Sequence, residues 1–403
     1  MNDTAVPQTS VPLVSPAPSA QVVFSGERSA FRRLVVRGAF LELVTVGFYR
    51  FWLATDMRRH LWSNTSVNGD AAEYIGTPKE LLIGFLFALA ILAPLYLGYF
   101  LLGLEAERLQ AFASVPLGLF FYLFAQFALY RARRYRLTRT IWRGVRFWMT
   151  GSGWNYAWRA GLWTLLVFVT FGLALPWRQA ALERFKMRRI SYGDLQGRFD
   201  GRGADLFKRG WLLWLAYAIL LLAPFVLGVL QMPILMGLSI FVLMFGQLFI
   251  YAMYKAIEWR WWILGLRLGE VSFDTTIGRG EFIGLYWKMA GWMTLFVLLL
   301  FAWLGVVVGI AFLASDFTGP PQQKFLIVSQ QWSVLIASGL GYVVVILTVW
   351  AVMRIYLIHD IWQRVASSVT VYNLAAAEGA AARGEAVGAL GEGFADSLDV
   401  VGF

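Results

Sequence analysis

The chain has 403 residues, of which 59% are hydrophobic and only 15% are charged, and its mean hydropathy is +0.61. A soluble protein of this size carries about a quarter charged residues, so the composition argues against a soluble globular enzyme. The absence of cysteine excludes disulfides, thiolate catalysis and Cys-ligated metals. The two histidines, His60 and His359, lie far apart in the sequence. We therefore expect no metal ion, no cofactor and no catalytic residue, and we predict that the protein is not an enzyme.

The net charge of +11 has two readings, because both nucleic acids and membranes attract basic proteins. In so apolar a chain the arginines are better explained as topology signals and as contacts for lipid headgroups. We predict membrane lipids with anionic headgroups as partners and no nucleic acid. The sequence leaves open whether the chain has a protein partner or forms a homo-oligomer.

Residues 1–20 are rich in proline and serine and lack the basic start and apolar stretch of a signal peptide. We predict a disordered cytoplasmic tail there. A membrane domain built from repeats is expected over residues 21–373, followed by an acidic tail over residues 374–403.

Six segments are long and apolar enough to cross a bilayer, which takes about 20 residues. They are residues 81–103, 111–130, 210–230, 232–254, 285–313 and 333–353. Two further segments, 38–54 and 160–177, are shorter or interrupted by charged or helix-breaking residues.

Loop charge decides how these two segments are interpreted. The stretches 131–159 and 178–209 are both rich in arginine or lysine, which concentrate on the cytoplasmic side. If 160–177 crossed the membrane, one of these stretches would lie outside, and the same conflict arises around 38–54. We therefore predict that both segments are re-entrant or interfacial. The fold class expected is a polytopic α-helical membrane protein, with about six transmembrane helices in three hairpins and both termini cytoplasmic.

Short β-elements are expected beside the basic stretches. The strongest signal is Asn68-Gly69 within 64–77, because this dipeptide favours a two-residue hairpin turn. Similar stretches are 140–157, 189–201, 264–276 and 365–379. The segments LELVTVGFYRFW and LLVFVTFGLALPW also resemble each other. These similarities predict internal repeats, which are common in transporters but are not restricted to them.

Several motifs in order identify a family resemblance. They are Phe24-Ser25-Gly26-Glu27, LVTVGFYRFW, RRHLW, EYIGTPKELLIGF, MRIYLIHDIWQRV and ALGEGFADSLD. The chain resembles, over about residues 22–399, the YjgN-like family of bacterial inner-membrane proteins, a domain of unknown function. The resemblance implies an inner-membrane location and supplies no activity.

Candidate site residues follow from unusual chemistry or from these motifs. Glu42 lies inside an apolar element, where burial would raise its pKa unless it pairs with Arg37 or Arg50. Glu80 follows the Thr77-Pro78 boundary, where a carboxylate suits a helix start. Gln126 and Gln247 suit interhelical hydrogen bonds or a substrate contact. Further candidates at motif positions are Trp52, Arg58, Arg59, Tyr74, Gly76, Pro176 and Trp177.

Two functions remain open from the sequence. One is transport of a neutral or amphipathic solute or of a lipid. The alternative is a non-enzymatic scaffold or anionic-lipid-binding protein with a cytoplasmic docking surface. The lipid reading draws on a group of tryptophans and arginines within residues 142–159, namely Trp142, Arg143, Arg146, Trp148, Trp154, Trp158 and Arg159.

Overall fold

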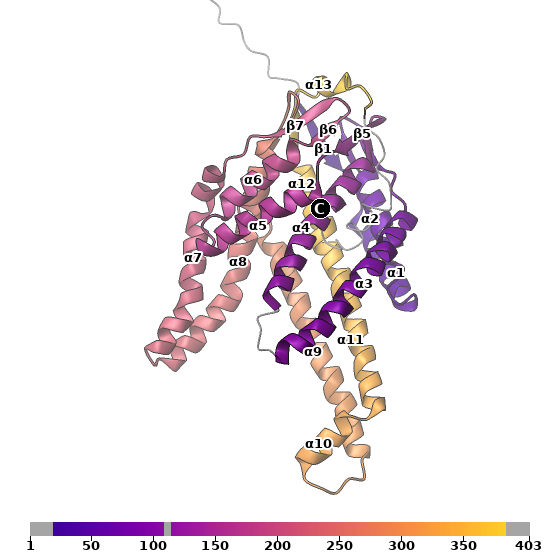
Figure 1. Cartoon of the computed structure of the whole chain (residues 1–403), viewed down its shortest axis with the longest axis vertical. Coiled ribbons are helices and arrows are strands. Elements are labelled where there is room, and N and C mark those ends of the chain that lie inside the picture. The colour runs from indigo at the N-terminus through magenta and orange to yellow at the C-terminus, as the bar shows by residue number, and fades with distance from the viewer. Residues whose placement is uncertain (1–18, 109–113, 384–403) are drawn as a thin grey trace, which may run out of the picture.

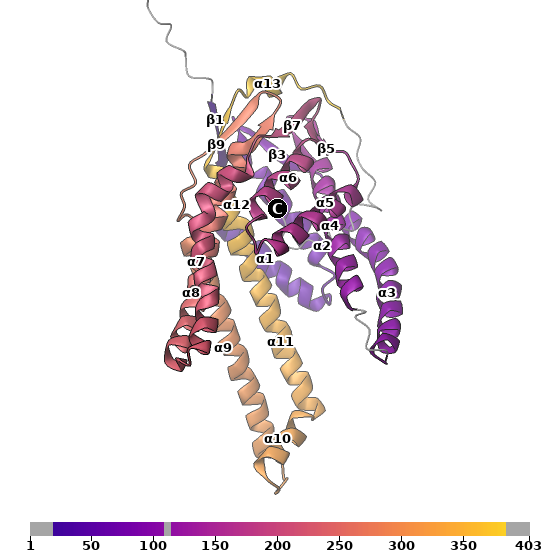
Figure 2. The ribbon, with the colours of Figure 1, turned by 60° about the vertical axis from the view of Figure 1, so that its left-hand side comes forward.

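The computed structural model describes residues 19–108 and 114–383. Ten strands form one closed antiparallel barrel, from which pairs of helices extend in one direction (Figures 1 and 2). The strands are β1 (Ser19–Phe24), β2 (Thr65–Val67), β3 (Asp70–Tyr74), β4 (Thr140–Trp142), β5 (Val145–Met149), β6 (Ile190–Tyr192), β7 (Leu195–Phe199), β8 (Leu266–Leu268), β9 (Val271–Thr275) and β10 (Val369–Tyr372).

The helices alternate with β-hairpins along the chain. They are α1 (Arg28–Val44), α2 (Arg50–Ser63), α3 (Pro78–Arg108), α4 (Ser114–Thr138), α5 (Gly153–Val169), α6 (Leu175–Met187), α7 (Gly203–Val229), α8 (Pro233–Gly265), α9 (Ile283–Ala314), α10 (Pro321–Ser329), α11 (Trp332–Met353), the π-helix η1 (Arg354–Asp360), α12 (Ile361–Ser367) and α13 (Ala375–Glu378). The pairs α1–α2 and α5–α6 are short, whereas α9 and α11 reach farthest from the barrel (Figure 1).

The barrel closes through its first strand. Residues 19–21 of β1 pair with β10, and residues 22–24 of the same strand pair with β2. Large side chains from many strands fill the interior, including Trp142, Tyr192 and Val371. The stretches in which we expected small β-elements do contain strands, but these strands form one continuous barrel. Closure removes the unpaired sheet edges that separate small elements would expose.

The C-terminal part of the described chain lies over one open end of this barrel. Ala377 of α13 packs against the barrel core. Glu378 accepts a hydrogen bond from Arg143 at 3.2 Å, and the amide of Ala381 donates to Asp194 at 3.0 Å. Ser19 and Ala20 belong to β1, while residues 1–18 and 384–403 of the two expected tails lie outside the described residues.

The short helical pairs share one turn geometry. Val46 and Phe171 have φ of 51° and 48°, and the glycine after each, Gly47 and Gly172, has φ of 87° and 88°. In each turn a threonine hydroxyl donates to the carbonyl four residues earlier and accepts from the amide four residues later. The similarity of LVTVGFY and FVTFGLA in the sequence therefore reflects a shared turn with a left-handed residue before a glycine.

The expectation of about six transmembrane helices is wrong. Among the described residues, five helices are long and apolar enough to cross a membrane: α3, α7, α8, α9 and the continuous helix Trp332–Ser367. The described part of the segment expected at 111–130, residues 114–130, lies in α4, which is not among these five helices. The expected arrangement of three transmembrane hairpins therefore does not hold.

A glycine forms each of several corners between strand and helix, and a preceding aromatic ring folds over it. A Cβ on Gly26, Gly76 or Gly201 would lie 2.4–2.6 Å from the ring of Phe24, Tyr74 or Phe199, respectively. Real Cβ atoms do not approach so closely, so any side chain here displaces a ring from the barrel rim. The aromatic-x-Gly pattern thus fixes where a strand ends and a helix begins.

We predict that Gly76→Ala destabilises the protein by about 1–3 kcal/mol, because the added methyl overpacks the corner. Gly278→Ala is the matched control, since Gly278 lies between β9 and α9 with open space around its Cβ position. Thermal unfolding of both variants in detergent measures the difference. Equal melting temperatures for the two variants would show that the ring of Tyr74 does not require a glycine.

Candidate functional site

Glu42 is held in a buried ion pair with the π-helix. Its carboxylate accepts hydrogen bonds from the guanidinium of Arg354 at 2.8 and 3.0 Å, and the two residues are 4% and 5% exposed. The hydrogen-bonded partner is thus Arg354 of η1, and Arg50, one of the two arginines expected from the sequence, also interacts electrostatically with Glu42. Such a pair neutralises two charges that burial would otherwise penalise heavily. Glu42 therefore has a structural partner, and no reacting group accompanies it among the described residues.

A second charged contact joins the same two helices. Arg28 of α1 donates to both carboxylate oxygens of Asp360 at 2.9–3.1 Å, and His359 contacts Asp360 at 2.9 Å. The rings of His60 and His359 both pack against Phe31, with centroids 5.6 and 5.0 Å away. The fold thus brings together two histidines that are distant in sequence. Among the described residues, however, no group of three or more His, Asp or Glu could hold a metal ion.

Four of the predicted motif positions meet where β3 turns into α3. Arg58 donates to the hydroxyl of Tyr74 at 3.1 Å, and Arg59 donates to the carbonyl of Gly76 at 3.0 Å. Arg58 is also within cation–π distance of the Tyr74 ring. These contacts fasten α2 to the barrel rim, which is a structural task.

Glu80 lies in the first turn of α3, beside the same corner. It accepts hydrogen bonds from Arg139 at 2.9 and 3.0 Å and from the hydroxyl of Tyr135 at 2.7 Å. Both partners come from the end of α4, and the sequence pattern did not single them out. The contact ties the start of α3 to the end of α4.

The remaining predicted positions do not join this corner. Trp52 stacks near Tyr49 on α2, and Trp177 lies 5.3 Å from the ring of Phe207. Pro176 is buried in the first turn of α6. Within the described residues, neither Gln126 nor Gln247 makes an interhelical hydrogen bond, and Gln247 is exposed.

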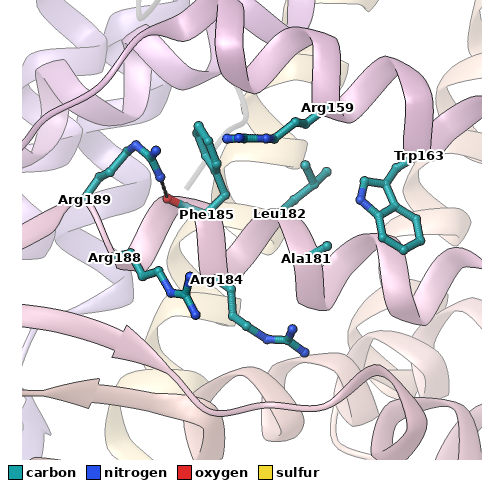
Figure 3. Close-up of a pocket in the computed structure, with 8 residues that line it drawn as sticks. All are labelled: Arg159, Trp163, Ala181, Leu182, Arg184, Phe185, Arg188 and Arg189. Atoms are coloured by element: carbon teal, nitrogen blue, oxygen red, sulfur yellow. Dashed lines mark hydrogen bonds between the residues drawn. The ribbon is translucent and has the colours of Figure 1, made fainter.

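A basic groove lies between α5 and α6. It has a volume of about 580 Å³ and is lined by Arg159, Trp163, Ala181, Leu182, Arg184, Phe185, Arg188 and Arg189. Figure 3 shows the guanidiniums of Arg159 and Arg189 on opposite sides of the Phe185 ring. Their distances from the ring centroid are 4.5 and 3.7 Å. Cation–π contacts of this kind hold a guanidinium in place without neutralising its charge.

The groove carries uncompensated positive charge. Within the described residues, none of its four arginines forms an ion pair with a carboxylate; Arg184 and Arg189 donate to the carbonyls of Gly201 and Phe185. The acid of α6, Glu183, does not pair with these arginines. It forms ion pairs with Lys186 and Arg133 and accepts a hydrogen bond from the indole of Trp262. Although burial opposes ionisation, the charges of Lys186 and Arg133 hold the pKa of Glu183 below its ordinary value.

The sequence located this groove only in part. Of the tryptophans and arginines considered together in 142–159, Arg159 lines the groove, but Trp142 is buried in the barrel and Arg143 pairs with Asp70 at 2.6 Å. The other arginines come from the end of α6 and the two residues that follow it, and the four-residue spacing of Arg184 and Arg188 favours one side of the helix end. That spacing was available in the sequence. The pairing of α6 with α5, which forms the groove, was not.

A closed barrel carrying apolar helices and a basic groove defines this chain as a membrane-associated protein with a strongly basic surface. The chain belongs to the family of bacterial proteins of unknown function called DUF898, whose sequence model matches residues 19–397. This is the YjgN-like family that the motifs indicated. No curated protein and no solved structure matches the chain.

We expect Glu42→Gln to destabilise the fold by about 3–5 kcal/mol, because it leaves the Arg354 charge buried without a partner. Replacing both residues, in Glu42→Leu/Arg354→Met, should recover most of this loss. Glu281→Gln breaks the half-exposed pair of Glu281 with Arg364 and serves as the control, with an expected cost below about 1 kcal/mol. Thermal unfolding in detergent compares the three. A Glu42→Gln variant as stable as the control would show that the buried pair does not hold α1 against η1.

Proposed function

We propose that this protein is a non-enzymatic, anionic-lipid-binding protein of the bacterial inner membrane. The observation that carries the proposal is the groove between α5 and α6, where four arginines without carboxylate partners line one cavity. Guanidinium groups bind phosphate oxygens through charge-assisted hydrogen bonds, often two at a time. A volume of about 580 Å³ is in the range of sites for small organic ligands and is larger than a bare phosphate requires.

The exposed surface next to the groove supports a lipid rather than a soluble anion. From Arg159, the same side of α5 continues through Leu162 and Leu166 to Val169, which are 64%, 45% and 64% exposed. The turn beyond carries Phe171, which is 88% exposed. Apolar side chains stay exposed at such density where a membrane or a partner covers them. A headgroup at Arg159 would place its acyl chains along this stripe.

The other short pair has a similar distribution. On α1 the exposed Arg32, Arg33 and Arg37 are followed by Phe40 and by the turn residue Val46, which are 64% and 87% exposed. Arginine at headgroup level and apolar side chains beyond it are typical of interfacial helices. We therefore propose that both short pairs enter the cytoplasmic leaflet without crossing it. Their shared turn supports an origin of the helical pairs by internal repetition.

Transport is the second candidate, and one feature favours it. The candidate span Trp332–Ser367 includes the π-helix, which places Arg354, His359 and Asp360 in one apolar helix. Ionisable residues within spans often mark substrate or ion paths, and π-helices often occur at functional sites. These groups are paired with Glu42 and Arg28, so we rank transport below lipid binding. Failure of reconstituted protein to move lipid between leaflets would remove lipid transport as a candidate.

The proposed topology is testable because the natural chain has no cysteine. Gln196→Cys, on the exposed side of β7, should react with an impermeant thiol reagent only from the cytoplasmic side. Thr318→Cys, in the loop between α9 and α10, should react from the periplasm. Labelling intact cells and inverted vesicles distinguishes the two sides. Reaction of position 196 in intact cells would contradict a cytoplasmic barrel.

Lipid binding is tested by removing charge from the groove. Arg159→Gln/Arg188→Gln should reduce the anionic lipid that co-purifies with the protein by about tenfold, because each lost phosphate contact costs on the order of 1 kcal/mol. Arg198→Gln/Arg267→Gln removes equal charge from the barrel, where both arginines contact Asp200, and should retain lipid. Phosphate analysis and lipid mass spectrometry give the readout. Equal lipid loss in both variants would assign the binding to overall charge rather than to the groove.

A further inference from the structure

The four arginines of the groove fall into two pairs. Arg159 of α5 and Arg189, which follows α6, lie against the two sides of the Phe185 ring (Figure 3). Arg184 and Arg188 are one turn apart, and their side chains extend to the other side of the groove in the same view. Phe185, between the two guanidiniums of the first pair, and Leu182 are apolar side chains of the lining. Each pair presents several N–H donors, enough to hold one phosphate group.

We propose that the groove recognises a lipid headgroup carrying two phosphodiesters joined by a short linker, the chemistry of cardiolipin. This inference rests on the proposed function and adds the number of phosphates. One phosphate lies against Arg159 and Arg189, and the other lies against Arg184 and Arg188. A headgroup with a single phosphate engages one pair and leaves the other uncompensated, so it binds more weakly.

The charge and chemistry of the lining agree with this assignment. Four guanidiniums against two phosphodiester charges leave a positive site, which favours retention in an anionic leaflet. The lining contains no carboxylate that would repel the second phosphate. Trp163 lies on α5 one turn beyond Arg159, toward the exposed Leu166, where an indole suits the level between headgroup and acyl chains. Compact soluble diphosphates offer the charge but cannot use this apolar stripe.

The test compares lipids at matched phosphate. Purified full-length chain in detergent is titrated with cardiolipin or with twice the molar amount of phosphatidylglycerol, and bound lipid is counted by native mass spectrometry. We expect the apparent affinity for cardiolipin to exceed that for phosphatidylglycerol by about tenfold or more, because a second engaged pair is worth at least on the order of 1.4 kcal/mol. Inorganic pyrophosphate, added as the soluble competitor, should not displace the bound cardiolipin.

Variants assign the preference to the two pairs. Arg184→Gln/Arg188→Gln should lower the affinity for cardiolipin to that for phosphatidylglycerol while leaving the latter bound at the remaining pair. Arg159→Gln/Arg189→Gln should likewise lower the affinity for cardiolipin to that for phosphatidylglycerol, with Arg184 and Arg188 as the remaining pair. The control Arg198→Gln/Arg267→Gln should keep the wild-type ratio. A variant is compared with the wild-type chain only if their melting temperatures lie within a few degrees of each other. The ratio of the wild-type affinities for cardiolipin and phosphatidylglycerol tests the proposal without any variant.

The outcomes separate this inference from the proposed function. Equal affinities of the wild-type chain for both lipids, with binding lost only in groove variants, would overturn the two-phosphate assignment and leave lipid binding in place. Binding that is unchanged in every groove variant, or absent for both lipids, would overturn both. Displacement of cardiolipin by pyrophosphate would identify a soluble diphosphate as the ligand and overturn the lipid assignment.

Discussion

Closure of the barrel by β1 is the interaction on which the rest of the structure depends. This strand divides its backbone hydrogen bonds between β10 at one end and β2 at the other, so the second and the last strands of the fold share one partner. Without it, β2 and β10 would both expose unpaired backbone groups, which favour association with other chains. Because each β-hairpin carries a pair of helices, the closed ring also fixes where every pair begins. The helices α5 and α6 connect β5 to β6, which are paired in the ring, so the barrel sets the position of the groove between these helices.

The two ion pairs of α1 provide a second constraint. Glu42 lies on the buried face of that helix with Phe31 and Val35, Arg28 is an exposed residue at its start, and their partners Arg354 and Asp360 bracket the π-helix. The signs alternate, so α1 can meet η1 in only one direction without placing like charges together. This arrangement accounts for charged residues in an apolar helix more simply than catalysis does. It also ties the short α1–α2 pair to the span that follows α10, which binds the two ends of the chain together.

Local signals in the sequence predicted local structure well. Asn68-Gly69 forms the expected hairpin turn with φ of 53° and 87°, and the other expected stretches each hold strands of the barrel. The repeated Thr-x-Gly segments form one turn geometry. The number of spans was not predicted correctly: α4, which holds the described part of the apolar segment 111–130, continues into a run of arginines from Arg131 and is not one of the five candidate spans. The aromatic-x-Gly pattern was present in the sequence. Only the structure shows that the aromatic ring covers the glycine and leaves no room for a Cβ atom.

The sequence by itself determined that this chain associates with a membrane, that its basic stretches alternate with apolar ones, and where its β-hairpins turn. These properties depend on composition and on neighbours within a few residues, which the chain order displays directly. The tertiary structure decided that β1 closes a barrel, that Glu42 pairs with Arg354 312 residues away, and that arginines from two helices share one groove. Each of these contacts joins distant segments, and many alternative pairings of arginines with acids were equally compatible with the sequence. The antiparallel strand order of the closed ring selected among them, because it sets which helical pairs are neighbours.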